Sequence, residues 1–247
     1  MRRLQIQPIP CLRDNYAYLV RADGDAWLVD PSELGPPKEA LGDLQLRGIL
    51  ATHHHYDHVG GIEGLVAGAP APIVVAAHAS DRGRVPAQNH FIDAPAGRFV
   101  PAGFEILGRP AQAMWIPGHT LGAIAWYLPP EVEGEGGDVF TGDTLFAAGC
   151  GRLFEGTPEQ MHTSLQALTA LPGSTRLWFG HEYTAANLRF AAQVEPDNPA
   201  IRQRQADLPS CTTPTTVALE RATNPFVRAA TAEVLAERRA AKDTFRG

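Results

Sequence analysis

Six consecutive residues, His53-His54-His55-Tyr56-Asp57-His58, concentrate side chains that bind metal ions. Neutral imidazole and carboxylate are the ligands expected for zinc, iron or manganese. The run follows the apolar residues 49–52, which predict a buried strand. In an extended segment His53 and His55 point to the same side and His54 points away, so His54 is the poorer ligand candidate. A metal site at this strand end is therefore predicted.

A histidine-rich run also has a less specific interpretation, as a purification tag or a loose metal-binding tract. This run is internal, follows a predicted strand and contains an aspartate at a fixed offset, so it fits neither. It is better explained as one part of a folded site whose other ligands lie elsewhere in the chain.

Three further predicted strands end in a glycine followed by a possible ligand. The motifs are Pro117-Gly118-His119-Thr120, Thr141-Gly142-Asp143-Thr144 and Gly180-His181-Glu182-Tyr183. A glycine lets the backbone turn sharply and approach a cavity closely. Each motif alone is weak, but four strand ends with ligand-type residues predict one shared site, because α/β proteins assemble sites from such loops.

The bulk composition is that of a globular protein with an acidic surface. The chain has 247 residues, 44% hydrophobic content and a net charge of −6, which allows one large core or a core with a small second domain. The acidic balance argues against a nucleic acid or a membrane surface as partner. Met1-Arg2-Arg3 leads directly into a strand-like segment, so no signal peptide is predicted. Three scattered cysteines suit a reducing cytosol, and we expect a cytoplasmic protein.

The predicted elements change in kind along the chain. Up to about residue 182, short strands alternate with turns and a few helices, of which residues 158–171 have the clearest helical spacing. After His181 every predicted element is helical. We therefore predict a β-rich α/β domain at residues 1–182 and a helical domain at residues 183–247. The end of the chain, residues 221–247, has six basic and three acidic residues, a possible site for a small anionic ligand.

The strand-end residues resemble the ligand pattern of the metallo-β-lactamase superfamily, in its hydrolytic dinuclear branch. The matching residues are Thr52-His53-x-His55-x-Asp57-His58, His119, Asp143 and His181. The resemblance implies an α/β fold, an αββα sandwich with the site at one edge of its two sheets. It also implies one metal ion held by His53, His55 and His119. A second ion would be held by Asp57, His58 and His181. Asp143 would bridge the two.

Such a centre implies a chemistry that needs no serine or cysteine nucleophile. Two cations lower the pKa of a shared water enough to supply hydroxide at neutral pH. The hydroxide would be the nucleophile, with Asp57 and Asp143 as its orienting ligands, and the metals would stabilise the oxyanion of a tetrahedral intermediate. We expect two divalent ions, with zinc as the first candidate and iron or manganese as alternatives.

Later motifs resemble one family within that superfamily, glyoxalase II. They are Gly142-Asp143-Thr144-Leu145-Phe146-x-x-Gly149-Cys150-Gly151-Arg152, Phe154-Glu155-Gly156-Thr157, Gly180-His181-Glu182-Tyr183-Thr184-x-x-Asn187-Leu188-x-Phe190, Asn224-Pro225-Phe226-x-Arg228 and Arg239-x-x-Lys242. The resemblance covers almost the whole chain. It implies hydrolysis of S-D-lactoylglutathione to D-lactate and glutathione, the second step of methylglyoxal detoxification.

The same resemblance implies the residues that bind glutathione. Arg239 and Lys242 would pair with its carboxylates, and their spacing places both on one helix face. Tyr183 would hydrogen-bond the glutathione backbone beside His181, and Arg152 would contact it from a neighbouring loop.

Two of these positions depart from the family pattern. Arg152 stands where a lysine is common, and Phe154 stands where many members have a tyrosine. Phe154 cannot donate a hydrogen bond, so one glutathione contact is expected to be lost or to move to a backbone amide.

Other functions stay open at this point. On the same fold, the chain could be another thioesterase or lactonase, or a persulfide dioxygenase, although the long helical C-terminal region favours glyoxalase II. A non-catalytic metal-binding scaffold is the alternative of another class, and the seven filled ligand positions argue against it. We expect a monomer whose partner is a small glutathione thioester.

Overall fold

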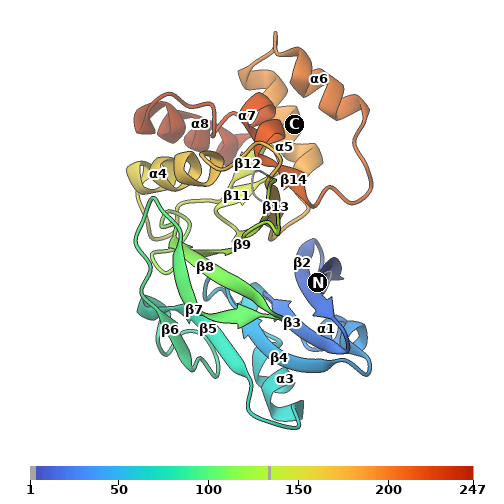
Figure 1. Cartoon of the computed structure of the whole chain (residues 1–247). Coiled ribbons are helices and arrows are strands. Elements are labelled where there is room, and N and C mark those ends of the chain that lie inside the picture. The colour runs from blue at the N-terminus through green and yellow to red at the C-terminus, as the bar shows by residue number, and fades with distance from the viewer. Residues whose placement is uncertain (1–3, 133–134, 247) are drawn as a thin grey trace.

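Two six-stranded β-sheets lie face to face in the computed structural model, with helices on both outer sides (Figure 1). The first sheet has the spatial order β1 (Gln5–Cys11), β2 (Asn15–Ala22), β3 (Asp25–Val29), β4 (Gln45–Leu50), β5 (Val74–His78) and β6 (His90–Ile92). The second has the order β14 (Thr215–Thr216), β13 (Arg176–Phe179), β10 (Asp138–Gly142), β9 (Ile124–Leu128), β8 (Arg109–Trp115) and β7 (Val100–Ile106). A small hairpin pairs β11 (Leu145–Phe146) with β12 (Gly149–Cys150). The structure describes residues 4–132 and 135–246, so Met1-Arg2-Arg3, on which the prediction about a signal peptide rests, lies outside it.

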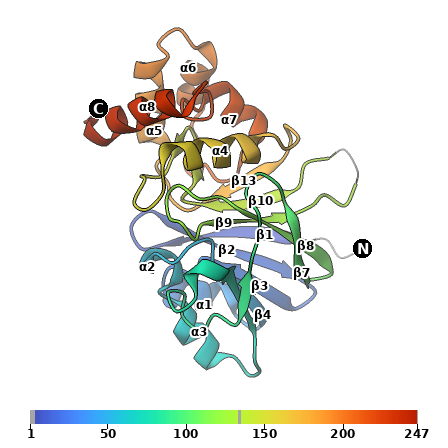
Figure 2. The same ribbon diagram turned by 90° about the vertical axis from the view of Figure 1, so that its left-hand side faces the viewer.

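Helices complete the four layers. The first sheet is covered by α1 (Gly35–Leu41), α2 (Tyr56–Val59) and α3 (Ile62–Gly68), and a 3₁₀ turn, η1 (Ala79–Asp81), follows β5. The later helices are α4 (Pro158–Thr169), α5 (Thr184–Val194), α6 (Pro199–Ala206), α7 (Val217–Thr223) and α8 (Ala232–Thr244). Figure 2 shows α4, α7 and α8 on the far side of the second sheet from β1–β4. This arrangement is the predicted αββα sandwich.

The inner strands are apolar on both faces because each sheet has a core on either side. In β2, Ala17 and Leu19 pack in the core beneath the helices, while Tyr18 and Val20 pack between the sheets. Successive side chains of a strand point to opposite faces, so a strand covered on both sides must be apolar throughout. All five residues of β9 are buried for the same reason.

The C-terminal helices share a core with the second sheet. One cluster contains Met161 of α4, Leu235 of α8, Phe226 from the segment between α7 and α8, and Val139 of β10. The start of α4 is fixed by a capping box, in which Thr157 and Gln160 each bond the other's backbone N–H. The helices are therefore the fourth layer of the sandwich, and the boundary at residues 182/183 stays a prediction.

One short strand interrupts the helical C-terminal region, so the prediction that only helices follow His181 is wrong at this point. Thr215 and Thr216 form β14, which pairs antiparallel with β13 at the edge of the second sheet. Two residues are too few to show a strand period in sequence. Their conformation is decided by the exposed edge of β13, which exists only after the sheet has formed.

The strands that precede the predicted ligands point to one edge of the sandwich. β3 and β4 are parallel, and so are β10 and β13. β8 and β10 share a direction because each is antiparallel to β9. The loops after β4, β8, β10 and β13 consequently meet. Within the described residues, none of the helices has the length and apolar character needed to cross a bilayer.

Candidate metal centre and substrate cavity

Three histidine nitrogens from two loops converge at the first predicted metal position. The loop after β4 carries His53 and His55, and the loop after β8 carries His119. His55 Nδ1 lies 3.1 Å from His53 Nε2 and 3.0 Å from His119 Nε2. The ligand atoms of all three residues lie within 4.8 Å of one another. The structure thus brings together the set that the sequence assigned to one ion.

The second predicted position is assembled from a helix and a distant strand end. Asp57 and His58 lie on α2, which begins directly after His55, and His181 follows β13. His181 Nε2 is 3.4 Å from Asp57 Oδ2, and the ligand atoms of the three residues again lie within 4.8 Å of one another.

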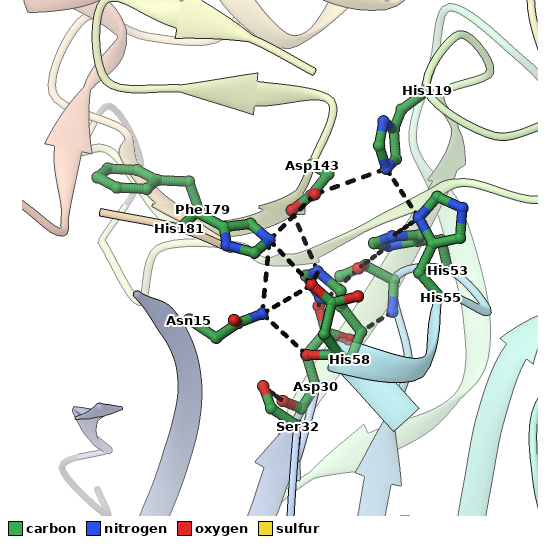
Figure 3. A network of polar contacts seen from close by, with 12 residues as sticks. Asn15, Asp30, Ser32, His53, His55, His58, His119, Asp143, Phe179 and His181 are labelled. Atoms are coloured by element: carbon green, nitrogen blue, oxygen red, sulfur yellow. Dashed lines mark hydrogen bonds and ion pairs between the residues drawn. The ribbon is translucent and has the colours of Figure 1, made fainter. Parts of the chain in front are cut away.

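Asp143 lies between the two groups (Figure 3). Its Oδ1 is 3.2 Å from His58 Nε2, and its Oδ2 is 3.2 Å from His181 Nε2 and 3.5 Å from His119 Nε2. The approach requires the glycine that precedes His181, since a Cβ at Gly180 would lie 2.2 Å from Asp143 Oδ1. Asp143 therefore faces both predicted positions, as a bridging ligand must.

The donor atoms of this cluster fit divalent cations. His58 Nε2 and Asp143 Oδ1 are buried, and among the described residues neither has a hydrogen-bond partner. They approach each other at 3.2 Å without hydrogen-bond geometry. Leaving such atoms unsatisfied costs about 1–3 kcal/mol each. Imidazole and carboxylate groups that converge in this way suit zinc, iron or manganese.

The cluster has two halves, the first predicted position (His53, His55 and His119) and the second (Asp57, His58 and His181). The pKa values of their histidines are shifted in opposite directions. Burial holds the pKa of His53 well below its ordinary value and lowers that of His55 to about 4, so both rings are neutral, as metal ligands must be. Burial also opposes charge on His58 and His181, but the nearby carboxylates, Asp143 foremost, outweigh it. They raise the pKa of His58 to about 10 and that of His181 to about 11. The second half therefore favours a positive charge, which a metal ion supplies.

His54 lies outside both groups. Its Nδ1 is 3.2 Å from Oδ1 of the buried Asp81, and its other ring nitrogen contacts Arg84. The alternation of side chains along the extended segment correctly separated it from His53 and His55.

Three polar residues that the sequence did not single out support the ligands. Asp30 Oδ2 lies 2.9 Å from His58 Nδ1, and Asp14 Oδ1 lies 2.9 Å from His181 Nδ1. Asn15 donates to Asp57 Oδ2 at 3.1 Å. Asp30 directly follows β3, so the same strand-then-ligand form could have identified it. Asp14 precedes β2 and Asn15 begins it, so neither has such a signal.

Asp30 could itself be counted as a ligand, because it forms a third possible group with His53 and His58. Its oxygens, however, already accept hydrogen bonds from the Thr52 amide at 2.7 Å and the Thr52 hydroxyl at 2.6 Å. We therefore assign it to the support of His58.

A cavity of about 700 Å³ extends from the metal ligands to α8, a size typical of small-molecule sites. It is lined by every residue predicted to bind substrate, namely Arg152, Phe154, His181, Tyr183, Arg239 and Lys242.

Two aromatic rings cover the ligands at the metal end of this cavity. The Phe154 ring packs edge-on against His55 and His119, with centroids 5.5 and 5.3 Å apart. The Tyr183 ring stacks on His181 with a centroid distance of 4.8 Å. These rings narrow the approach to the predicted ions.

The cationic residues at the other end differ from one another. Arg239 is buried, donates to the Cys150 carbonyl at 2.8 Å and pairs with Asp243 at 2.9 Å. Arg152 is exposed and lies 3.4 Å from Asp243. Lys242 is half-buried and donates to the Ala186 carbonyl at 3.1 Å. Burial, and then the charge of Arg239, lowers the pKa of Lys242 to about 8.

Comparison with known proteins decides the family. Residues 12–181 match the model of the metallo-beta-lactamase superfamily, and residues 182–246 match that of the hydroxyacylglutathione hydrolase C-terminus. The chain is 46% identical over 237 residues to a hydroxyacylglutathione hydrolase of Synechococcus sp. (strain JA-3-3Ab), covering 91% of this chain and 88% of that protein. A hydroxyacylglutathione hydrolase of Nostoc punctiforme is 43% identical over 235 residues, covering 91% and 89%. The chain belongs to the hydroxyacylglutathione hydrolase family.

Solved structures place this hydroxyacylglutathione hydrolase family member in a wider fold group. ETHE1 from Myxococcus xanthus has a TM-score of 0.66 at 25% identity, covering 100% of this chain and 92% of that one. TTHA1623, solved in a di-iron-bound form, has a TM-score of 0.60 at 27% identity, covering 89% and 99%. The family and the fold predicted from the sequence are thus confirmed.

Proposed function

We propose that this chain hydrolyses 2-hydroxyacylglutathione thioesters, S-D-lactoylglutathione first among them, to a 2-hydroxy acid and glutathione. One observation carries the proposal: a single cavity has a two-metal ligand set at one end and basic side chains at the other. A glutathione thioester has a matching polarity, with its reactive carbonyl at one end and its carboxylates at the other. The reaction would be the second step of methylglyoxal detoxification.

The cofactor we propose is a pair of divalent ions, zinc first and iron or manganese as alternatives. His53, His55 and His119 would hold one ion. Asp57, His58 and His181 would hold the other. Asp143 would bridge them. When bound, such ions supply a hydroxide nucleophile at neutral pH and polarise the thioester carbonyl. The di-iron form of TTHA1623 supports two occupied positions on this fold.

The protein's own groups bind and orient the substrate. Arg152 and Lys242 would meet the carboxylates of glutathione, because both line the cavity and Arg152 is exposed. Tyr183, held flat on His181, would present its hydroxyl to the peptide part of glutathione. Phe154 would exclude water beside His55 and His119. The leaving group is a thiolate, which needs no general acid.

The test is thiol release from S-D-lactoylglutathione by purified, metal-loaded protein. We expect thiol to appear at a rate far above that of a sample treated with chelator. A simple thioester without the peptide should react much more slowly, which distinguishes this activity from a general thioesterase. Protein that holds two metal ions and releases no thiol would refute the proposal. We place the reaction in the cytoplasm and expect a monomer, which gel filtration tests.

A further inference from the structure

Each histidine of the cluster has one ring nitrogen that faces the predicted metal position and a second that faces away. The hydrogen-bond partners of these second nitrogens differ between the two halves of the cluster. In the second half both partners are carboxylates. His58 Nδ1 lies 2.9 Å from Asp30 Oδ2, and His181 Nδ1 lies 2.9 Å from Asp14 Oδ1. Figure 3 shows Asp30 behind His58, on the side away from Asp143.

In the first half the partners are neutral. His119 Nδ1 donates to the Arg152 carbonyl at 2.8 Å. His53 Nδ1 lies 3.1 Å from Thr52 Oγ1, which itself donates to Asp30. His55 turns its Nδ1 toward the other two ligands, so this nitrogen is the donor atom rather than the supported one.

The backbone positions Asp14 beside His181. Among the described contacts, His181 is the one predicted ligand that the Asp14 carboxylate bonds. Asp14 immediately precedes β2, and its carbonyl accepts the Glu182 amide at 2.8 Å. The next residue, Asn15, forms a β-bridge with His181 and donates to Asp57 Oδ2 at 3.1 Å. Asp14 and Asn15 therefore support His181 and Asp57, two of the three residues in the second half.

Asp30 is less selective. It lies buried behind His58, and through the Thr52 hydroxyl it is also connected to His53. A change at Asp30 would reach both halves of the cluster, whereas a change at Asp14 would reach only the second.

A carboxylate behind a metal-bound imidazole fixes the tautomer and the ring orientation and makes the ring a stronger ligand. We propose that Asp14 is a positioning residue for the second metal position alone, so that the two positions respond unequally to its loss. This inference rests on the two-metal centre of the proposed function. It concerns how the ions are held, and its test therefore needs no substrate.

The experiment is a chelator competition on full-length protein loaded with zinc, followed by metal analysis. Asp14→Asn keeps the size of the side chain and removes its charge. We expect it to lose one of two ions at a chelator concentration about 10–100-fold lower than wild type requires, and to keep the other ion as firmly as wild type.

The matched control is Glu182→Gln. Glu182 adjoins His181, but its carboxylate accepts hydrogen bonds from Tyr16 and Thr212 instead of the histidine. This variant should retain both ions as wild type does. Asp14→Glu, which keeps the charge, should recover part of the lost affinity.

Cobalt identifies which ion is lost. Apo-protein titrated with Co²⁺ gives a visible absorption spectrum for each position, and His181→Ala and His119→Ala provide references for the loss of either one. We expect the spectrum of Asp14→Asn to match that of His181→Ala. Equal loss of both ions, unchanged retention of both, or a match to His119→Ala would overturn the inference. If wild-type protein holds two ions and Asp14→Asn loses one of them, but the wild type releases no thiol from S-D-lactoylglutathione, the proposed function is refuted and this inference stands.

Discussion

The two ends of the cavity present their charged groups in opposite ways. At the metal end, the donor atoms of the seven predicted ligands point toward one another, and two of these atoms have no partner within the described residues. At the α8 end, two of the three nitrogens of the Arg239 guanidinium are bonded, to the Cys150 carbonyl and to Asp243, and its buried Nε is left without a partner within the described residues. Several buried donor atoms that converge on one another suit a metal ion, whereas a buried guanidinium that is bonded through two of its three nitrogens suits a structural role.

The same difference in available partners separates two basic residues for which the sequence predicted the same role. Arg239 and Lys242 were both predicted to meet glutathione carboxylates, and both line the cavity. Arg239 is buried and lies over the Phe226 ring. Lys242 also lies near aromatic rings, those of Phe190 and Phe245, but it is only half-buried and has one carbonyl partner and no carboxylate partner among the described contacts. The comparison predicts that Arg239 contributes chiefly to stability and Lys242 chiefly to binding.

The largest expected effect is at the metal end. Asp143→Ala should remove the bridging carboxylate, reduce the metal content and lower kcat/KM by about a thousandfold or more, since metal assistance is worth several kcal/mol. Asp138→Asn is the control, because Asp138 is a second buried aspartate, at the start of the strand β10 that precedes Asp143, and its partners are Arg176 and Trp178. Its metal content should be unchanged. Full metal content and activity in Asp143→Ala would contradict the assignment.

The next effect separates Arg239 from Lys242. Arg239→Ala should lower the free energy of unfolding by about 2–3 kcal/mol, because it removes charge-assisted bonds to Cys150 and Asp243 from a buried place. Lys242→Ala should cost less than about 1 kcal/mol. Urea denaturation of the metal-loaded variants measures both. Equal destabilisation by the two substitutions would remove the distinction.

A smaller effect should appear in the pH dependence of binding. The pKa of Lys242 is lowered to about 8, so its charge is lost as the pH rises through that value. The KM for S-D-lactoylglutathione should therefore increase, by up to about tenfold, between pH 7 and pH 9. Lys242→Arg stays charged over this range and should give a flat profile. The sign for folding is opposite, because a lowered lysine pKa makes the folded state more stable as the pH rises from about 8 towards the ordinary value near 10.4. A KM that rises equally in both proteins would place the titration elsewhere.

The smallest effect tests the aromatic ring at the entrance. Phe154→Tyr adds a hydroxyl that can donate one hydrogen bond to the peptide part of glutathione. A net gain of about 0.5–1 kcal/mol would lower KM about two- to fivefold. The free energy of unfolding should stay within about 0.5 kcal/mol of wild type, because Phe154 is exposed. Unchanged KM values would show that this edge of the cavity does not contact the peptide.

The structure brings the predicted metal ligands together, and the sequence could indicate them because their signal is local. Each follows a strand, and in three cases a glycine directly precedes the ligand. The αββα fold, the family and the separation of His54 from His53 and His55 follow from similarly short-range patterns. The order of strands in two sheets then brings these loops to one edge.

What the sequence missed depends on contacts between distant segments. β14 is a strand only because β13 offers it an edge. Asp14 meets His181 because Asn15 forms a bridge with that residue, 166 positions away. The burial of Arg239 depends on α8 packing over Cys150 and Phe226. No local spacing shows any of these.

The sequence by itself thus determined which residues can bind metal and which strand ends carry those residues. It also determined the family to which the chain belongs. The tertiary structure decided which charged side chains have polar atoms available to a ligand and which are mainly hydrogen-bonded to other protein groups. The physical reason is that side-chain type fixes the chemistry a group can perform, whereas its availability depends on the partners and burial that only the folded chain provides.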